Sequence, residues 1–165
     1  MSKLLQRKSV LKVKEFLQYV DQSIELIELE ETARTAVDAA SSLNKEVGAI
    51  VKSLLFSAGD NFVLCLVSGD KRCSLRALKK FLDEKDVSMA SPDDVKKITG
   101  YTIGGVSPVG HLSTVKIYID TNLERFTTVF AAAGHPNCVF KIQFNQLVKL
   151  TSGEIKEIAE WDNQN

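Results

Sequence analysis

The feature that most limits the possible folds is a pair of apolar segments joined by a short turn. Residues 47–56 and 62–67 are apolar almost throughout, and the stretch between them, Ser-Ala-Gly-Asp-Asn at 57–61, is typical of turns. Two such segments around a turn predict a β-hairpin. Strands that are apolar on both faces are typical of a sheet that is covered on both sides, so we expect other elements to pack on each face.

Hydrophobic periodicity and capping residues predict the remaining elements. Helices are expected over residues 9–19, 35–43, 75–82, 92–99 and 145–150. Further strands are expected over residues 24–29, 115–119, 128–133 and 139–142, followed by a polar tail. This mixture predicts one compact α/β (α+β) domain over residues 1–165, with a mixed, strongly curved sheet and short helices around it.

The charge balance excludes several classes of protein. Lys plus Arg number 21 and Asp plus Glu number 21, which gives a formal net charge of zero. A protein that binds along a long nucleic-acid backbone is normally basic, so any contact with nucleic acid should be local, and DNA is not an expected partner.

The N-terminus shows no targeting or membrane segment. Its basic residues are followed by acidic residues and by no long apolar segment. We therefore expect no signal peptide, no membrane span and a cytoplasmic location.

The cysteines and histidines do not form a recognisable site. Cys65, Cys73 and Cys138 contain no Cys-x-x-Cys pair, and His111 and His135 stand apart from them in the sequence. No metal site is predicted, and the cysteines are expected to be reduced thiols. A cysteine hydrolase stays open as an alternative only through Cys138, and it would need a histidine beside that thiol.

Lys52 is the clearest exception to the local pattern. With a period of two, its face of the strand also carries Ile50, Leu54 and Phe56, and the opposite face is apolar too. A lysine in this setting is costly unless its ammonium reaches water, a carboxylate or a ligand anion. Lys52 is therefore a candidate functional residue. The alternative is a lysine near a sheet edge whose ammonium extends into solvent.

A second candidate is the loop 102–111, which reads Thr-Ile-Gly-Gly-Val-Ser-Pro-Val-Gly-His. Its three glycines and one proline predict a fixed, tight backbone path. Backbone N–H groups in such a loop can bind an anion or a developing oxyanion. The loop lacks the Gly-Lys-Ser/Thr ending of a phosphate-binding P-loop. A plain connecting loop is the alternative.

A third candidate is the run of small residues Ala-Ala-Ala-Gly at 131–134, which ends a predicted strand. Small side chains running into a glycine leave room for a ligand to approach. The alternative, which we favour on the sequence alone, is tight packing of this strand against its neighbours.

The ordered set of motifs resembles the YbaK/prolyl-tRNA-synthetase-associated (ProX-like) editing domains, which are free-standing trans-editing deacylases. The resemblance is strongest over residues 20–150. The matching pieces are Thr35-x-x-x-Ala39-Ala40, Val51-Lys52-Ser53-Leu54, Val67-Ser68-Gly69-Asp70, Met89-Ala90-Ser91-Pro92, Thr99-Gly100-Tyr101, Gly104-Gly105-Val106-Ser107-Pro108-Val109-Gly110 and Ala132-Ala133-Gly134.

The resemblance implies hydrolysis of the ester bond of a misacylated tRNA, often tRNA for proline, without a metal or a cofactor. It implies a functional role for Lys52 and a loop from Gly104 to Pro108 that borders the pocket. The sequence after Gly110 is similar to that of family members that act on small amino acids such as alanine. The partners it implies are the acceptor end of tRNA and an aminoacyl-tRNA synthetase. A non-catalytic module that binds either of them is the alternative.

The chemistry of an aminoacyl ester fits these residues. The ester is already activated, so a site needs only to anchor the terminal nucleotide, stabilise the oxyanion and place a water. Lys52 can supply a positive charge, while Gly104 and Gly105 can supply backbone donors. A ribose hydroxyl of the substrate can assist, so neither Lys52 nor His111 has to act as a base. Further substrate contacts are expected at Thr35, Ser53, Ser107, Pro108, His111, Ala133 and Gly134.

Overall fold

The predicted hairpin lies at the centre of the structure, a computed structural model that describes residues 3–30 and 35–162. Its strands are β2 (Ile50–Ala58) and β3 (Asn61–Ser68). They pair antiparallel from Val51 opposite Ser68 to Ala58 opposite Asn61. Gly59 has a φ of 60°, the left-handed conformation that this tight turn requires.

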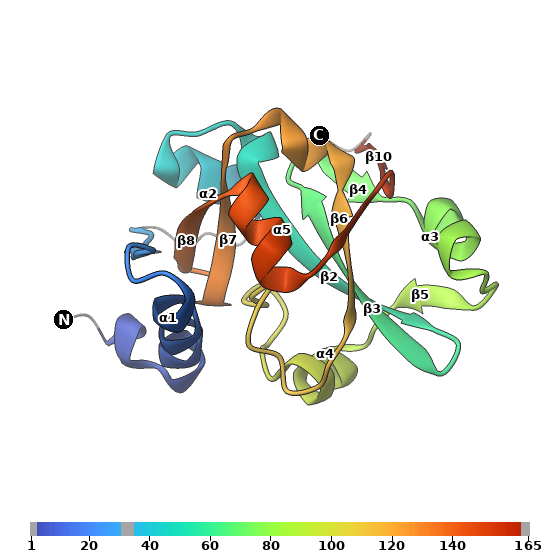
Figure 1. Cartoon of the computed structure of the whole chain (residues 1–165), viewed down its shortest axis with the longest axis horizontal. Coiled ribbons are helices and arrows are strands. Elements are labelled where there is room, and N and C mark those ends of the chain that lie inside the picture. Colours follow the sequence, from blue (N-terminus) through green and yellow to red (C-terminus); the bar gives the residue numbers. More distant parts are fainter. Residues whose placement is uncertain (1–2, 31–34, 163–165) are drawn as a thin grey trace.

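The described residues form an eight-stranded mixed sheet (Figure 1), in which the order is β1-β8-β7-β2-β3-β6-β9 and β5 pairs with β2 off this path. The added strands are β1 (Leu26–Glu28), β5 (Val87–Met89), β6 (Lys116–Asp120), β7 (Thr128–His135), β8 (Cys138–Gln143) and β9 (Glu154–Lys156). Pairing is parallel for β2–β7, β3–β6 and β6–β9, and antiparallel for the other pairs. A separate two-stranded sheet joins β4 (Lys71–Cys73) to β10 (Ala159–Trp161). The prediction of a mixed sheet is confirmed.

The predicted helices form close to their expected positions. They are α1 (Lys8–Val20), α2 (Ala36–Leu43), α3 (Leu75–Leu82), α4 (Pro92–Thr99) and α5 (Phe144–Thr151), with short 3-10 turns at Leu4–Gln6, Val47–Ala49 and Thr121–Arg125. The side chains of Thr35, Ser74 and Ser91 each accept a hydrogen bond from a backbone N–H in the first turn of their helix. Gly100, with a φ of 84°, ends α4 as predicted.

The structure differs from the sequence prediction mainly in short strands. Residues 47–49 form a 3-10 turn ahead of β2 rather than part of the strand. The tail that was expected only to be polar contains β9 and β10, while β4 and β5 are also additional. Each of these strands has three residues, too few to show a period, so their pairing with longer strands defines them.

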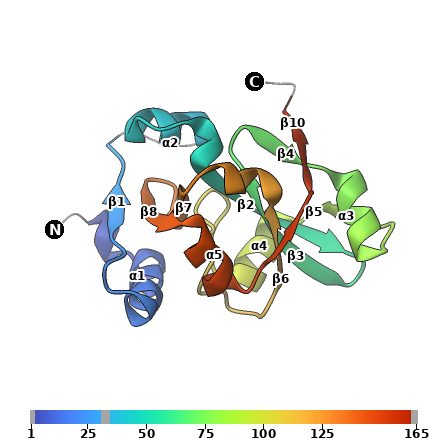
Figure 2. The same cartoon turned by 45° about the horizontal axis from the view of Figure 1, so that its top comes forward.

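Both faces of the sheet are covered, as the apolar hairpin predicted. On one face, Val51 and Leu55 of β2 share the main core with Val13 of α1, Val95 of α4 and Leu147 of α5. On the other face, α2 packs over β7, β8 and the start of β2, while α3 packs over β3 and β6. Figures 1 and 2 show α2 and α3 at opposite ends of the molecule, so they leave the middle of this face between them.

No helix of the described ranges 3–30 and 35–162 is long and apolar enough to cross a membrane.

Gly69 lies in the turn between β3 and β4, where only a glycine fits. A Cβ built on Gly69 would overlap the carbonyl oxygen of Val47 and lie 3.0 Å from the Cβ of Ala36. Because this oxygen belongs to the backbone, it cannot turn aside. We expect Gly69→Ala to lower the free energy of unfolding by about 2–3 kcal/mol or more, as measured by denaturant titration.

Gly48→Ala is the matched control for Gly69→Ala. Its Cβ would meet only the ends of the Arg125 and Phe126 side chains, which can move. Equal losses of stability in the two variants would contradict the assignment of a special role to Gly69.

Candidate functional site

A cavity of about 440 Å³ opens where β2 loses its neighbouring strand. β2 pairs with β7 only at Ile50 and Val51, and with β5 only from Phe56 onward. Between these pairings, no other described strand pairs with this edge of β2, and residues 52–54 border the cavity instead. The cavity therefore results from the sheet topology, and β2 contributes polar groups to its wall.

The cavity is lined mostly by small or apolar side chains from elements far apart in the sequence. They include Ala36 and Ala39 of α2, Phe130 and Ala132 of β7, Val139 of β8 and Ile103 of the predicted loop. Polar side chains in the described part of the lining are those of Thr35, Lys52, Ser53 and Asp162. An apolar cavity with a few convergent polar groups is the usual form of a small-molecule site.

Lys52 lines the cavity, and its ammonium donates a hydrogen bond to the backbone carbonyl of Lys71. Burial lowers the pKa of this ammonium, while the carboxylates of Asp162, Asp70 and Asp120 act in the opposite direction, in that order. The sequence alone suggested that only water, a carboxylate or a ligand could satisfy this charge. The structure corrects that expectation, because a strand carbonyl also serves it.

Ser53 follows Lys52 on β2 and carries an unsatisfied polar atom. Its hydroxyl oxygen is buried and has no hydrogen-bond partner among the described residues. Unpartnered buried hydroxyls are rare in folded proteins and call for an explanation. Because Ser53 also lines the cavity, a polar group of a ligand or a water molecule there would satisfy it.

The loop between α4 and β6 is tied down by its own hydrogen bonds. The Tyr101 hydroxyl donates to the Val109 carbonyl at 2.7 Å, and Nε2 of His111 lies 2.7 Å from the Ser107 carbonyl oxygen. The Gly105 amide donates to the Thr102 carbonyl at 3.0 Å. This agrees with the predicted fixed path. Of the two glycines expected to offer backbone donors, Gly105 already uses its N–H within the loop.

The structure brings some of the predicted site residues together and places others behind the cavity wall. Thr35, Lys52, Ser53 and Gly104 line the cavity. The other predicted site residues are absent from the described lining of the cavity: Gly105, Ser107, Pro108, His111, Ala133 and Gly134. Contacts of these six with substrate stay a prediction, and their visible role is to shape the loop and the strand behind it.

The end of β7 is closely packed on two sides. Gly134 lies against α1, where a Cβ on Gly134 would overlap the backbone of Ser9, and its carbonyl accepts a hydrogen bond from the Ser9 hydroxyl at 2.8 Å. A Cβ on Gly105 would lie 2.9 Å from the Cα of His135, so the loop packs directly on the β7 backbone. Ala132, in the middle of the same run, does line the cavity.

Sequence reasoning missed several lining residues, above all Asp162. Ile103 and Ala132 belong to motifs that were singled out, although their own positions were not. Asp162 carried no local signal, because its approach to Lys52 depends on the pairing of β10 with β4. Pro136 and Met89 also line the cavity and were not named as site residues.

The cysteine hydrolase alternative meets one of its conditions, because His135 pairs opposite Cys138 across β7 and β8, but the surroundings of the thiol oppose it. Cys138 is fully buried in the main core, and burial raises the pKa of its thiol to about 11. A reactive cysteine needs a lowered pKa and access to substrate. Within the described ranges, no cluster of three or more His, Cys, Asp or Glu side chains could hold a metal ion.

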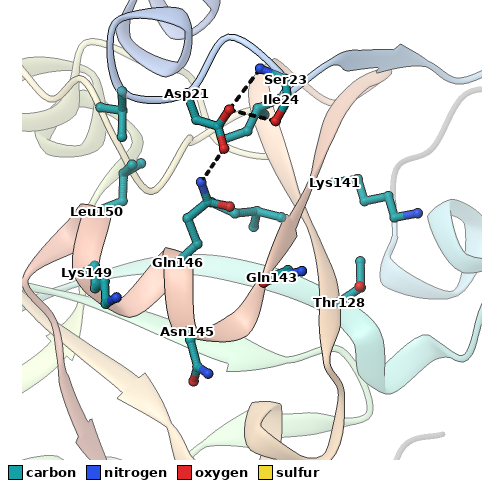
Figure 3. Close-up of a pocket in the computed structure, with 12 residues that line it drawn as sticks. Asp21, Ser23, Ile24, Thr128, Lys141, Gln143, Asn145, Gln146, Lys149 and Leu150 are labelled. Carbon is teal, nitrogen blue, oxygen red and sulfur yellow. Dashed lines mark hydrogen bonds between the residues drawn. The ribbon is translucent and has the colours of Figure 1, made fainter.

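A second hollow, of about 1140 Å³, lies between the end of α1, β8 and α5 (Figure 3). Its central carboxylate, Asp21, accepts hydrogen bonds from the amide and hydroxyl of Ser23 at 2.9 and 2.6 Å. It also accepts one from the side-chain amide of Gln146 at 2.8 Å. The hydrogen bond from the Ser23 side chain does most to lower the pKa of Asp21. None of the predicted site residues lines this hollow, and neighbouring groups already donate hydrogen bonds to the Asp21 carboxylate.

A sequence model of the aminoacyl-tRNA editing domain matches residues 30–150. The chain belongs to the aminoacyl-tRNA editing domain family. The family resemblance that the motifs indicated is therefore confirmed.

Relatives and solved structures agree with this assignment. An uncharacterized protein, YwhH of Bacillus subtilis, is 30% identical over 132 residues, which cover 79% of this chain and 83% of that protein. A proline–tRNA ligase of Thermosipho melanesiensis is 36% identical over 91 residues, 55% of this chain but 16% of the ligase. A crystal structure described as a candidate trans-editing enzyme for prolyl-tRNA synthetase is 34% identical, with a TM-score of 0.88 over 93% of this chain and 98% of that one.

Burial of His111 disfavours protonation of its imidazole in the folded state, which makes stability depend on pH. Burial is the main cause that lowers its pKa below the ordinary value of 6.5, and nearby Lys12 acts in the same direction. In the unfolded chain the imidazole binds a proton as the pH falls through 6.5, while the folded state resists it. The free energy of unfolding should therefore decrease on acidification between about pH 7.5 and 5.

We expect His111→Gln to weaken this pH dependence. Glutamine keeps an N–H donor for the Ser107 carbonyl but does not titrate. Denaturant titrations at several pH values should show a smaller loss of stability on acidification for the variant than for the wild type. His135 is present in both proteins, so its contribution cancels. Parallel curves for the two proteins would contradict the assignment.

Proposed function

We propose that this protein is a deacylase that hydrolyses the ester bond of a misacylated tRNA, with the aminoacyl group held in the 440 Å³ cavity. The observation that carries the proposal is the unpaired edge of β2. There an apolar cavity is lined by Lys52, whose ammonium is partly buried, and by Ser53, whose hydroxyl has no hydrogen-bond partner among the described residues. The chain's membership of the editing family supports this reading.

In the proposed mechanism, water attacks the ester carbonyl and negative charge develops on the carbonyl oxygen. The Lys52 ammonium attracts this charge or the terminal phosphate, while the Gly104 segment borders the reacting group. The bond from the carbonyl carbon to the ribose oxygen then breaks. The water's proton ends on that ribose oxygen, so the products are a free amino acid and tRNA. A neighbouring ribose hydroxyl of the substrate assists the proton transfer.

The proposed substrate is tRNA for proline that carries a small non-cognate amino acid such as alanine. The relation to a segment of a proline–tRNA ligase supports this tRNA. The side chains of Ala36, Ala39 and Ala132 form part of the apolar wall, and the rigid loop at Gly104 limits the cavity beside them. In this proposal the walls select the aminoacyl group by size, which separates analogues that differ by one methylene by only about 1–3 kcal/mol.

A deacylation panel tests the proposal. tRNA for proline and tRNA for alanine are each charged with alanine, cysteine or phenylalanine and incubated with the protein. We expect release of alanine from tRNA for proline to be fastest and phenylalanyl esters to persist. Binding of the charged tRNA without any hydrolysis would identify the non-catalytic module instead. Rapid cleavage of phenylalanyl esters would contradict selection by size.

Replacement of Lys52 tests the role of its charge. We expect Lys52→Ala to reduce the deacylation rate by about a hundredfold or more, a loss comparable to that of an oxyanion-stabilising group. Lys52→Arg should also be impaired, because the planar guanidinium is larger and donates in a different geometry. Lys116→Ala, which removes an exposed lysine of β6, is the control. A folded Lys52→Ala variant with the wild-type rate would show that Lys52 only fills space at the sheet edge.

A further inference from the structure

The C-terminal strand brings a carboxylate to the cavity from outside the region that matches the family. The match ends at residue 150, whereas β10 spans Ala159–Trp161 and Asp162 follows directly. β10 pairs antiparallel with β4 and places Trp161 opposite Lys71. Asp162 thereby lines the same cavity as Lys52.

Several contacts fix β10 in this position. Ile158, just before the strand, is fully buried, and its carbonyl accepts a hydrogen bond from the Ser74 amide at 2.6 Å. Glu160 and Arg72 also face each other across these strands at 2.9 Å, but both side chains are about half exposed, so this surface ion pair adds little to the hold. Lys71 is only 6% exposed, and its ammonium lies over the ring of Trp161. The segment that carries Asp162 is thus held at its start, along its length and at its end.

β4 and β10 approach Lys52 with different groups. The Lys71 carbonyl of β4 accepts the hydrogen bond from the Lys52 ammonium, and β10 leads to the Asp162 carboxylate. The two-stranded sheet therefore gives the ammonium a neutral acceptor and brings a negative charge to the cavity that Lys52 lines. Neither β4 nor β10 contributes any other charged side chain to the described lining of the cavity.

Within residues 3–30 and 35–162, the other titratable groups that act on Lys52 are Asp70, Asp120 and Cys73. Asp70 is committed to Arg125, whose guanidinium donates to its two carboxylate oxygens at 2.8 and 3.1 Å. Asp120 is fully buried and accepts from the amide of Ser68 and from Asn122. Of the three carboxylates, Asp162 alone lines the cavity.

We propose that Asp162 is a positioning residue for Lys52, which keeps the ammonium charged and directed at the cavity when substrate displaces water. The effect of Asp162 on catalysis rests on the proposed function. The effect of Asp162 on the charge of Lys52 does not. Desolvation favours loss of the proton from a lysine, and a nearby carboxylate opposes that loss. Asp162 transfers no proton in this role and forms no bond to the substrate.

The test compares Asp162→Asn with Asp162→Glu, and uses Glu160→Gln as the matched control. Glu160 lies on the same strand and carries the same charge, but it pairs with Arg72 at the surface and is outside the described lining. The first measurement is the pH dependence of Lys52 acetylation by acetic anhydride, read by mass spectrometry. The second is the pH–rate profile of deacylation with the best substrate of the panel.

We expect Asp162→Asn to shift the titration of Lys52 downward by about one pH unit, since one opposite charge has been removed. The alkaline limb of the pH–rate profile should move with it. The rate at the optimum should fall about ten- to a hundredfold because the ammonium is less well placed. In Asp162→Glu, the titration of Lys52 and the rate at the optimum should both lie close to their wild-type values. Glu160→Gln should change neither the titration of Lys52 nor the rate.

The two measurements separate failure of this inference from failure of the proposed function. If Lys52 in the Asp162→Asn variant titrates at the same pH as in the wild type, the inference is overturned, whatever the deacylation rate. The inference is also overturned if the variant loses the acidic limb of the pH–rate profile while the titration of Lys52 is unchanged, because Asp162 would then act as a base. If no substrate is hydrolysed but the titration of Lys52 still shifts, the proposed function fails while the placement of Asp162 beside Lys52 stands.

Discussion

The burial of one ammonium group in a strand that is packed on both faces governs the organisation of this domain. Lys52 lies in β2, between the main core on one face and the α2 and α3 layers on the other. A charge there is expensive unless several groups compensate for it. The fold supplies a strand carbonyl, nearby carboxylates and a cavity in which the edge of β2 is left unpaired. The site is therefore built around the single charged residue of an apolar segment.

Much of the fold could be predicted because its signals are local. The hairpin follows from two apolar runs around a turn, and three helices start directly after Thr35, Ser74 and Ser91, whose side chains cap them. Lys52 was identified for the same reason, since one charged residue in an apolar strand is visible without any tertiary information. The fixed path of the loop 102–111 was likewise predictable from its glycines and proline.

The parts that could not be predicted depend on partners distant in the sequence. The strands β4, β5, β9 and β10 have three residues each, so only their pairing defines them. The loop composition indicates a fixed path but not which side of it faces the cavity. Gly104 lines the cavity, whereas Gly105 packs on the backbone of β7. The sequence suggested that Gly134 leaves room for a ligand, but in the structure the backbone of Ser9 in α1 occupies the space that a Cβ on Gly134 would need.

The segments outside the family match complete the domain from two sides. Helix α1 precedes the matched residues, and its Val10, Val13 and Leu17 are fully buried in the main core. Burial of each such side chain contributes about 1.5–3 kcal/mol, so residues 30–150 alone would expose a large apolar surface over β7. On the opposite side, β10 completes the surroundings of Lys52. Stability and the electrostatics of the site are thus supplied partly by segments that the family motifs do not include. Motifs define the cavity, but the charge state of its lysine depends on what a particular chain packs around it.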